Sequence, residues 1–532
     1  MIPPEPFELP DDVGKIHAAP ADRPTFLVFV KEDCATCNLV LPMVQVLHQA
    51  TGETVDVTVV SQVGSDIPIL RDRHDLTMLI LDDSELDVSY DAALETVPSA
   101  FLFDETGECV AQTYGFLKSE WMELISAAEQ LGGTDAIPLD WDNLPALKPG
   151  CGAKNVEPGI LERLEARRSG KIQGHLIEIP TGVDVHEFLF ELGVTDGLPV
   201  VPPTPELVWS MLQGTQRDSQ EIVANVATSR AACTVEKAAV NAVMAGARPE
   251  FLPVILAGLE AVTVEDFNLH GIVCTLGAQA PVYVVNGPIR NVIGMNGGIN
   301  VLGQGNRANA AIGRSLQLIV RNVGGGKPGD EDRAAFGGPH KYTCCFPENE
   351  EASPWPPLHV ERGFDADQST VTVFPLEAPR AILDQYSTAA EQLANNIAWS
   401  LTSVTNSRMF NYGELLLALS PQHAGVIANS GWSKDDLRSY LVEATKKPLS
   451  TLLADRQCGE GMDKHRYPMI DRVVGEPPDD PDQLVSKLSS KEMLNIVVTG
   501  GDASPFSMLF GGWGFFVPLP AGNRSVTVEV VT

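Results

Sequence analysis

The chain has 532 residues, of which 44% are hydrophobic and 20% charged, a balance typical of folded globular proteins and a length sufficient for several domains. Its 37 lysines and arginines stand against 70 aspartates and glutamates, and the formal net charge of -33 leads us to expect no nucleic-acid partner and no acidic membrane surface. No window reaches the roughly 18 apolar residues of a membrane-spanning helix and the first residues lack the features of a secretory signal, so the sequence predicts a cytoplasmic protein with mostly free thiols.

Two cysteines follow the first strongly apolar segment of the N-terminal quarter, residues 1–133. Residues 26–30 read as a buried strand; Cys34 and Cys37 follow in a Cys-x-x-Cys motif, and apolar residues then recur at helical spacing. This order places Cys34 at a helix N-terminus, where free N–H groups and the helix dipole favour the thiolate. Cys37 lies about one helical turn further and could close a disulfide. We therefore predict a redox-active disulfide in which Cys34 attacks and Cys37 resolves.

The rest of this quarter continues the same alternation of strands and helices. The predicted elements are strands at residues 55–60, 99–103 and 109–112 and a helix at residues 118–131. Together with the Cys-x-x-Cys motif and with Thr96-Val97-Pro98 before the second of these strands, residues 24–133 resemble a thioredoxin-like domain. The resemblance implies thiol–disulfide oxidoreductase activity and a cis proline, Pro98, beside the two cysteines. Glu32 and Asp33 stand where that family usually has an aromatic residue, and we expect their charges to oppose thiolate formation at Cys34.

Residues 134–190 mix proline, glycine and charged residues and are predicted as a linker that contains a short helix at residues 160–168. Cys151 lies in this segment between two glycines, on a backbone that can approach other groups closely. Such a thiol could shuttle electrons or could be an exposed bystander.

Residues 191–532 are predicted as one large domain, with a break near residues 376–425 if it holds two subdomains. Strand-like runs alternate with helices there without tandem repetition, and a helical hairpin is expected at residues 234–245 and 249–262. The whole chain is therefore predicted as α/β, with an N-terminal thioredoxin-like domain fused to a larger α/β (or α+β) domain that has Gly-rich loops.

A glycine-rich segment at residues 294–305 leads from an apolar strand into a helix. Glycines let backbone N–H groups turn toward an anion, and a helix N-terminus adds positive potential. We predict that residues of this segment and of a later glycine turn bind a small polar or anionic substrate: Gly298, Gly305, Asn306, Arg307 and Ser504. Because Arg307, Arg314 and Arg321 fall seven residues apart, the alternative is a stripe of exposed arginines on one helix face.

The most polar segment of the large domain, residues 337–364, supplies the remaining predicted catalytic residues. They are His340, Cys344, Cys345 and Glu348. A disulfide between adjacent cysteines is strained and easily reduced, which suits a redox acceptor. The same pair could capture a soft metal or an arsenical, or each thiol could be a small buried hydrophobe.

Three stretches of the large domain resemble uncharacterised bacterial proteins, some of them related to a (seleno)protein family named for a Sec-Gly-Ser-Cys motif. The stretches are VMAGARPEFLPVILAGLEAV, NRANAAIGRSLQLIVRNVGG and ENEEASPWPPLHVERGF. The tetrad itself does not occur here in its Sec or Cys form. The resemblance implies a thiol-dependent chemistry without naming a reaction.

The leading functional hypothesis is a thiol-dependent oxidoreductase in which the Cys-x-x-Cys domain supplies electrons to a reaction on a small substrate in the large domain. An external thiol reductant or a thioredoxin reductase would recharge the disulfide; no other cofactor and no metal site are predicted. One alternative is a non-redox lyase or hydrolase that uses Glu348, His340 or Lys341 as acid and base, with the N-terminal domain as a docking or regulatory module. Another is the handling of thiophilic metals or organometals through the cysteine pairs. The sequence does not predict an oligomeric state.

Overall fold

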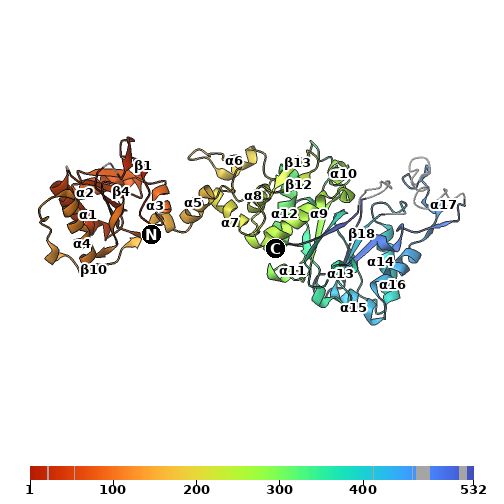
Figure 1. Ribbon diagram of the computed structural model, residues 1–532. Helices are drawn as coiled ribbons and strands as arrows, with labels where there is room; N and C mark the ends of the chain where they lie inside the picture. Colours follow the sequence, from red (N-terminus) through yellow and green to blue (C-terminus); the bar gives the residue numbers. More distant parts are fainter. Residues whose placement is uncertain are drawn as a thin grey trace. The chain divides into compact units, whose positions relative to one another are not determined.

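The computed structural model describes residues 1–20, 23–52, 54–410, 413–457, 459–462, 480–513 and 524–531. The chain divides into two compact units, Met1–Gly170 and Lys171–Thr532 (Figure 1). Cys458, one of the nine cysteines of the chain, lies outside the described residues. In the part of the chain that the structure describes, no helix has the length and apolar character to cross a membrane.

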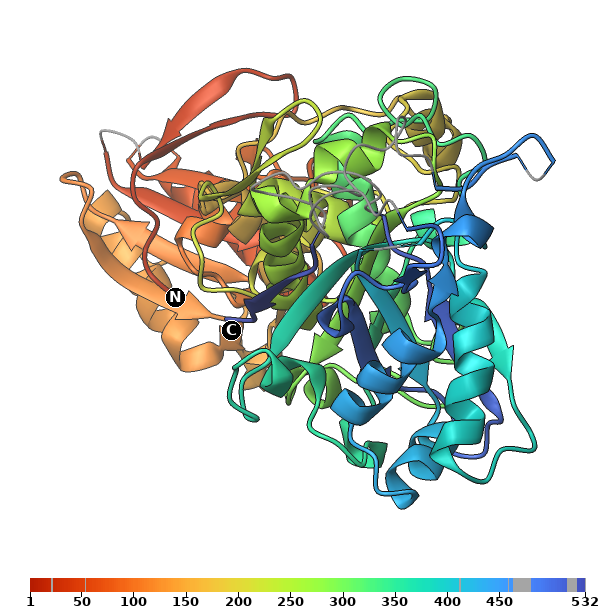
Figure 2. The ribbon, with the colours of Figure 1, turned by 90° about the vertical axis from the view of Figure 1, so that its right-hand side faces the viewer.

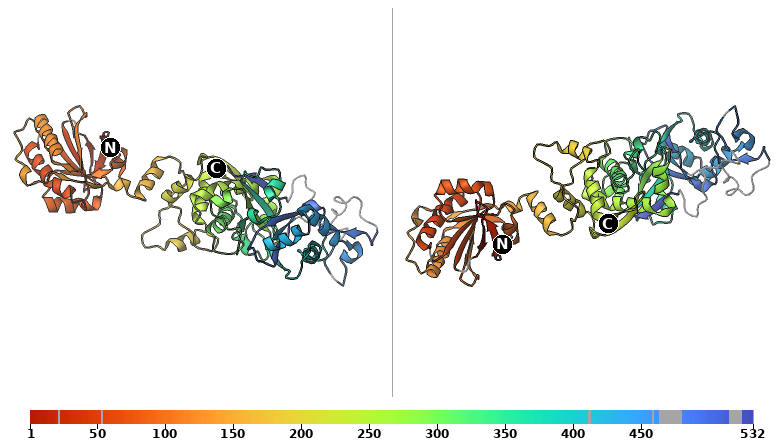
Figure 3. Two further views of the ribbon diagram at one scale, coloured as in Figure 1. Left: turned by 90° about the horizontal axis from the view of Figure 1, so that it is seen from below. Right: turned by 90° about the horizontal axis from the view of Figure 1, so that it is seen from above.

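A five-stranded sheet forms the centre of the first unit, with the strand order β5-β4-β3-β7-β8. Its strands are β3 (Thr25–Val30), β4 (Asp56–Ser61), β5 (Leu79–Asp82), β7 (Ser99–Phe103) and β8 (Cys109–Tyr114). The first three run parallel, and β7 and β8 are antiparallel additions. Every residue of β3 and β7 is buried, as expected for apolar strands with helices on both faces of the sheet (Figure 3).

The helices of this unit are α1 (Cys37–Thr51), α2 (Ile67–His74), α3 (Asp87–Asp91), α4 (Lys118–Gly132) and α5 (Ile160–Arg168). α1 follows β3 directly, and the Val97–Pro98 peptide bond before β7 is cis. The mixed sheet, the cysteine motif at the start of α1 and the proline before β7 together give the thioredoxin-like fold that the sequence predicted. The predicted limits of β7 and α5 are those of the structure.

Short strands complete the first unit: β1 (Phe7–Pro10), β2 (Ile16–Ala19), β6 (Thr96–Val97), β9 (Phe116–Leu117), β10 (Leu147–Lys148) and β11 (Cys151–Gly152). β10 pairs with β9 and β11 pairs with β6. The structure thus places the first part of the predicted linker, up to α5, within the first unit, and residues 171–190 within the second.

The second unit contains two four-stranded sheets. The first has the order β15-β14-β16-β23, formed by β14 (Ala280–Asn286), β15 (Cys345–Pro347), β16 (Thr370–Leu376) and β23 (Val526–Glu529). The second has the order β17-β22-β18-β21, formed by β17 (Arg380–Leu383), β18 (Leu415–Leu419), β21 (Leu494–Val498) and β22 (Phe506–Phe510). β14 pairs parallel with β15 and antiparallel with β16, and β18 pairs parallel with β21 and antiparallel with β22.

Alternate residues of the central strands build two different cores. Tyr283 and Val285 of β14 point to the helices α8 (Val235–Met244), α9 (Leu252–Thr263) and α12 (Arg307–Asn322), whereas Val282 and Val284 join a cluster with Leu416 of β18. Because side chains alternate along a strand, this pattern packs the two sheets face to face between layers of helices. Over the second sheet lie α14 (Ala390–Thr402) and α16 (Lys434–Ala444), side by side (Figure 2).

Smaller elements connect these layers. They are the helices α6 (Val185–Glu191), α7 (Pro205–Leu212), α10 (Leu269–Cys274), α11 (Ile289–Val292), α13 (Leu358–Glu361), α15 (Pro421–Asn429) and α17 (Leu449–Leu452), and the strands β12 (Ile222–Val226), β13 (Ala231–Thr234), β19 (Lys447–Pro448) and β20 (Leu484–Val485). The predicted helical hairpin corresponds to α8 and α9, which a left-handed Gly246 separates.

Candidate functional site

Cys34 and Cys37 lie together at the N-terminus of α1 in the first unit. Both are 0% exposed. The Cys37 backbone N–H donates to Cys34 Sγ at 3.2 Å, as expected for a sulfur at a helix start, where N–H groups lack helical partners. Cys34 Sγ also lies 3.4 Å from the carbonyl oxygen of Val97, the residue before Pro98. The structure therefore brings together the cysteines and the proline that the sequence singled out.

The two thiols differ strongly in acidity. A hydrogen bond from the Cys37 thiol, helped by Cys151 and by backbone N–H groups, lowers the pKa of Cys34 to about 5 against the opposing effect of burial. Burial and the neighbouring Cys34 sulfur raise the pKa of Cys37 far above its usual range. At neutral pH, Cys34 is therefore a thiolate and Cys37 retains its proton. This division provides an attacking sulfur and a proton-carrying partner beside it.

The expected opposition of Glu32 and Asp33 to the Cys34 thiolate is outweighed. Glu32 forms an ion pair with Arg73, and Asp33 Oδ1 lies 3.6 Å from Lys31 Nζ. Lys31 and Arg73 offset the negative charges of the two carboxylates. The hydrogen bonds at Cys34 therefore set its lowered pKa.

A third thiol, Cys151, lies beside Cys34. β11 pairs antiparallel with β6 so that Cys151 stands opposite Val97. The Cys151 thiol contributes a hydrogen bond that lowers the pKa of Cys34, while burial and the Cys34 sulfur raise the pKa of Cys151. The sequence left open whether Cys151 shuttles electrons or is a bystander; the flanking glycines were the one signal of a close approach.

The polar groups of the glycine-rich segment of the second unit form hydrogen bonds with other groups of the protein. The Asn306 side chain accepts from the Asn309 N–H at 2.9 Å and so caps α12, and Arg307 Nε donates to the Gly246 carbonyl oxygen at 2.8 Å. The Gly298 N–H donates to the Asn296 side chain at 2.9 Å. Gly305 has a positive φ of 113°, which favours glycine there. Nothing in this geometry turns the predicted anion-binding groups toward a ligand, so their role in binding stays a prediction.

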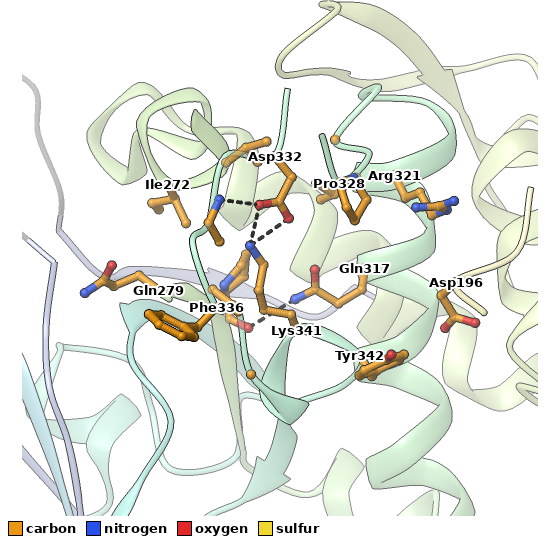
Figure 4. A pocket seen from close by; sticks show the side chains of 18 of the residues that line it. Asp196, Ile272, Gln279, Gln317, Arg321, Pro328, Asp332, Phe336, Lys341 and Tyr342 are labelled. Carbon is orange, nitrogen blue, oxygen red and sulfur yellow. Dashed lines mark hydrogen bonds and ion pairs between the residues drawn. The ribbon is translucent and has the colours of Figure 1, made fainter. Parts of the chain in front are cut away.

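A cavity of about 310 Å³ lies elsewhere in the same unit, and the last arginine of the stripe lines it (Figure 4). Arg321 shares this cavity with Gln317, Asp332 and Lys341. Lys341 Nζ lies 2.7 Å from Asp332 Oδ2, whereas the buried Nε of Arg321 has no partner among the described residues. The sequence could not separate Arg321 from Arg307, because the two share one helix face.

His340 and Cys345 are buried next to this region, and Cys344 is partly exposed. His340 Nε2 lies 2.7 Å from the Ala278 carbonyl oxygen, and burial lowers the pKa of its ring. Burial raises the pKa of Cys344 to about 12 and that of Cys345 further. Neither thiol is a thiolate at neutral pH, which matches the alternative of small buried hydrophobes more closely than that of a reactive pair.

Glu348 and Ser504 have structural partners of their own. The buried Glu348 Oε2 accepts from the Leu358 N–H and from Asn286 Nδ2, both at 2.8 Å, and Lys434 Nζ lies 3.7 Å from its Oε1. The Ser504 carbonyl oxygen accepts from the Ser420 hydroxyl at 2.7 Å.

The glycine-rich segment, Glu348 and the end of β21 lie together: the Gly500 N–H donates to the Gly297 carbonyl oxygen at 2.8 Å, and the Val498 N–H donates to Glu348 Oε1 at 3.3 Å. Among the described residues, no hydrogen bond or ion pair joins Arg307, His340, Glu348 and Ser504 to one another. The described ranges also contain no group of three or more His, Cys, Asp or Glu side chains that could hold a metal ion.

Comparison with known proteins finds solved structures that are similar to about a quarter of the chain. No protein-family model matches. No curated protein matches either. StoA from Bacillus subtilis is 24% identical and covers 23% of this chain and 97% of its own, with a TM-score of 0.21. A secreted Mycobacterium tuberculosis disulfide oxidoreductase described as homologous to E. coli DsbE is 15% identical, with coverages of 23% and 95% and a TM-score of 0.21. A thiol-disulfide oxidoreductase from Bacteroides fragilis is 17% identical, with coverages of 23% and 97% and the same TM-score of 0.21.

The thioredoxin-like assignment rests on the strand order and the cysteine motif described above. The relation of the large domain to the Sec-Gly-Ser-Cys family stays a prediction.

Proposed function

We propose that the protein is a thiol–disulfide oxidoreductase in which Cys34 is the nucleophile and Cys37 the resolving thiol. The observation that carries the proposal is the buried pair at the start of α1, in which hydrogen bonds lower the pKa of Cys34 to about 5 while Cys37 stays protonated. The Cys34 thiolate attacks one sulfur of a partner disulfide, and the other partner sulfur leaves as a thiolate. Cys37 then gives up its proton and attacks Cys34 Sγ, which releases the second partner thiol and closes the Cys34–Cys37 disulfide.

We further propose that the electrons serve a reaction on a small polar or anionic substrate bound by the second unit. The cavity beside Arg321 supports this, since the buried guanidinium Nε has no partner among the described residues; Lys341, the other cation of the cavity lining, is paired with Asp332. A carboxylate or phosphate group would satisfy that unpaired donor. An external thiol reductant, or a thioredoxin reductase, would return the Cys34–Cys37 disulfide to the dithiol, and a reducing cytoplasm is the location that suits this cycle.

Reduction of insulin disulfides by dithiothreitol tests the first proposal. The full-length protein should accelerate the reaction, and Cys34→Ser and Cys37→Ser should each abolish the acceleration. Cys109→Ser is the matched control, because Cys109 lies in the same unit and burial raises its pKa. Equal rates for Cys34→Ser and the unmodified protein would refute the proposal.

Calorimetric titration with inorganic phosphate and with succinate tests the second proposal. Arg321→Gln should weaken the binding of whichever anion the protein takes. Arg307→Gln is the control, because Arg307 already donates to the Gly246 carbonyl and should leave binding unchanged. Loss of binding in the Arg307 variant alone would place the anion at the glycine-rich segment and contradict the cavity proposal.

A further inference from the structure

Residues 144–156, which we call the strap, are bound at both ends to the rest of the first unit by hydrogen bonds. At one end, the Lys118 N–H donates to the Ala146 carbonyl oxygen at 2.9 Å, next to the β10–β9 pair. At the other end, the buried Asn155 side chain donates to the Leu94 carbonyl oxygen at 2.8 Å. Both anchors are backbone carbonyl or amide groups of the folded unit, so the path of the strap between them is defined.

The middle of the strap runs over the cysteine motif. Lys148 Nζ donates to the Ala35 carbonyl oxygen at 2.7 Å, and the Thr36 hydroxyl donates to the Pro149 carbonyl oxygen at 2.6 Å. Ala35 and Thr36 are the two residues between the cysteines. The strap therefore holds the motif by side-chain contacts on the very residues that separate the two thiols.

The strap delivers its own thiol to Cys34. The β11–β6 pair sets Cys151 opposite Val97, whose carbonyl oxygen lies 3.4 Å from Cys34 Sγ. The two thiols also act on each other electrostatically: Cys151 lowers the pKa of Cys34, and the Cys34 sulfur raises the pKa of Cys151.

The neighbouring glycine makes this approach possible. A Cβ at Gly150 would lie 2.2 Å from Thr96 Cγ2 and 2.7 Å from the Val97 carbonyl oxygen. Any other residue would push the strap away from β6. At Gly152, on the other side of Cys151, a Cβ would meet nothing within 4 Å.

The third thiol is more accessible to a dissolved thiol than the redox pair is. Cys34 and Cys37 are fully buried, whereas Cys151 is partly exposed. A dissolved thiol therefore meets Cys151 more readily than Cys34 in this conformation.

We propose that Cys151 is a third redox-active thiol, which exchanges with the Cys34–Cys37 disulfide and passes electrons from an external thiol reductant to the buried pair. This inference rests on the proposed oxidoreductase function. The Cys151 thiolate attacks Cys34 Sγ: the Cys34–Cys151 bond forms, the Cys34–Cys37 bond breaks, and Cys37 leaves as a thiolate and takes a proton. A reductant thiolate then attacks the exposed Cys151 sulfur, forming a mixed disulfide and releasing the Cys34 thiolate. A second reductant thiol closes the reductant disulfide and releases Cys151, so two electrons have reached the pair.

The acidity of the thiols favours the second step of this route, whereas the first step starts from Cys151 and expels Cys37, both of which have a raised pKa. A sulfur leaves faster in disulfide exchange when its thiol has a lower pKa. Cys34 has the lowered pKa of the three, so an attack on the Cys34–Cys151 disulfide at the Cys151 sulfur expels the better leaving group.

Disulfide mapping tests the exchange. The Cys37→Ser variant of the full chain, oxidised with diamide, quenched in acid with N-ethylmaleimide and digested without reductant, should yield a Cys34–Cys151 cross-linked peptide as the main product. A Cys34 that stays free or pairs elsewhere would overturn the proposal. The unmodified protein, held in glutathione buffers of graded potential, should yield the same peptide beside the Cys34–Cys37 product, and this measurement does not depend on the folding of a variant.

The rate of reduction tests the relay. Without Cys151, glutathione has to attack the buried pair directly, so at equal glutathione the Cys151→Ser variant should be reduced about tenfold more slowly than the unmodified protein. Gly150→Ala should also slow the relay and lower the yield of Cys34–Cys151, whereas Gly152→Ala should match the unmodified protein. Equal reduction rates for Cys151→Ser and the unmodified protein would overturn the relay.

The two proposals fail in different ways. If Cys34 and Cys37 form no disulfide at any potential, the oxidoreductase function is wrong. If they form one and cycle normally while no Cys34–Cys151 bond appears, only the role of Cys151 is wrong.

Discussion

Removal of the Cys37 thiol should raise the pKa of Cys34, because the hydrogen bond from Cys37 is the largest cause that lowers it. In the reduced protein the pKa of Cys34 is about 5. In the Cys37→Ala variant we expect a value closer to that of an ordinary thiol, about 8.5. Cys151→Ala should produce a smaller rise, since the hydrogen bond of Cys151 is a smaller cause of the same shift.

Alkylation rates at neutral pH measure this change poorly. Between a pKa of about 8.5 and one of about 5, the thiolate fraction at pH 7 rises roughly 30-fold. Over the same interval the intrinsic nucleophilicity of the thiolate falls roughly 25- to 55-fold, because the Brønsted coefficient is about 0.4–0.5. The two effects nearly cancel, and the burial of Cys34 slows alkylation further. The pH at which the thiolate appears is therefore the quantity to measure.

The ultraviolet absorbance of the thiolate gives that pH directly and needs no access to the sulfur. We expect reduced protein to show a transition at a pH of about 5 that is missing in Cys34→Ser and shifted upward in Cys37→Ala. Cys109→Ala is the control and should leave the transition in place. A transition in the unmodified protein at the pH of an ordinary thiol, or one that Cys37→Ala does not move, would refute the reasoning.

The same acidity and the buried charges of the second unit lead to two further predictions. Because the folded-state pKa of Cys34 lies below its unfolded value, its contribution to the free energy of unfolding is complete above about pH 8.5 and is lost as the pH falls to about 5. Chemical unfolding of reduced protein should show this rise with pH, and Cys34→Ser should flatten it. Lys434→Met should lower the free energy of unfolding by about 3–5 kcal/mol in urea titrations, because it leaves the buried Glu348 without its cation and removes one cation from Glu361. Lys446→Met, which removes an exposed ion pair, should cost no more than about 1 kcal/mol, and equal losses would contradict this account of Glu348.

The first unit was predictable because its signals are local. Apolar runs, turn residues and helical spacing predicted β7 and α5 with the limits that the structure has. The position of Cys34 at a helix start also follows from neighbouring residues alone. The strap was not predictable, since β10 and β11 consist of two residues each and pair with strands distant in the sequence. Pairs of that length leave no periodic pattern.

In the second unit, the apolar sequence of a strand does not determine what packs against it. The continuous apolar character of β14 and β18 indicates burial on both faces. It does not say whether a helix or a second sheet covers each face, so the face-to-face packing could not be predicted. β23 comes from the end of the chain to complete the first sheet, a connection that no local pattern encodes.

The predicted substrate residues of the second unit show a different limit. A glycine-rich turn before a helix has the same sequence whether its N–H groups face a ligand or the chain itself. Here Arg307 and Asn306 hold the loop and the helix start in place, and Arg321, two spacings further along the same face, lines the cavity. The seven-residue spacing identified the helix face that carries the arginines, but not which arginine lines the cavity.

The central claim is that Cys34 and Cys37 exchange electrons, and a redox titration tests it most directly. Full-length protein would be equilibrated in dithiothreitol buffers of graded potential, quenched in acid, alkylated and mapped by mass spectrometry. We predict a reversible two-electron transition between free thiols and a Cys34–Cys37 disulfide, while Cys344 and Cys345 remain reduced. Cys34 and Cys37 that stay as free thiols at every potential would contradict the account.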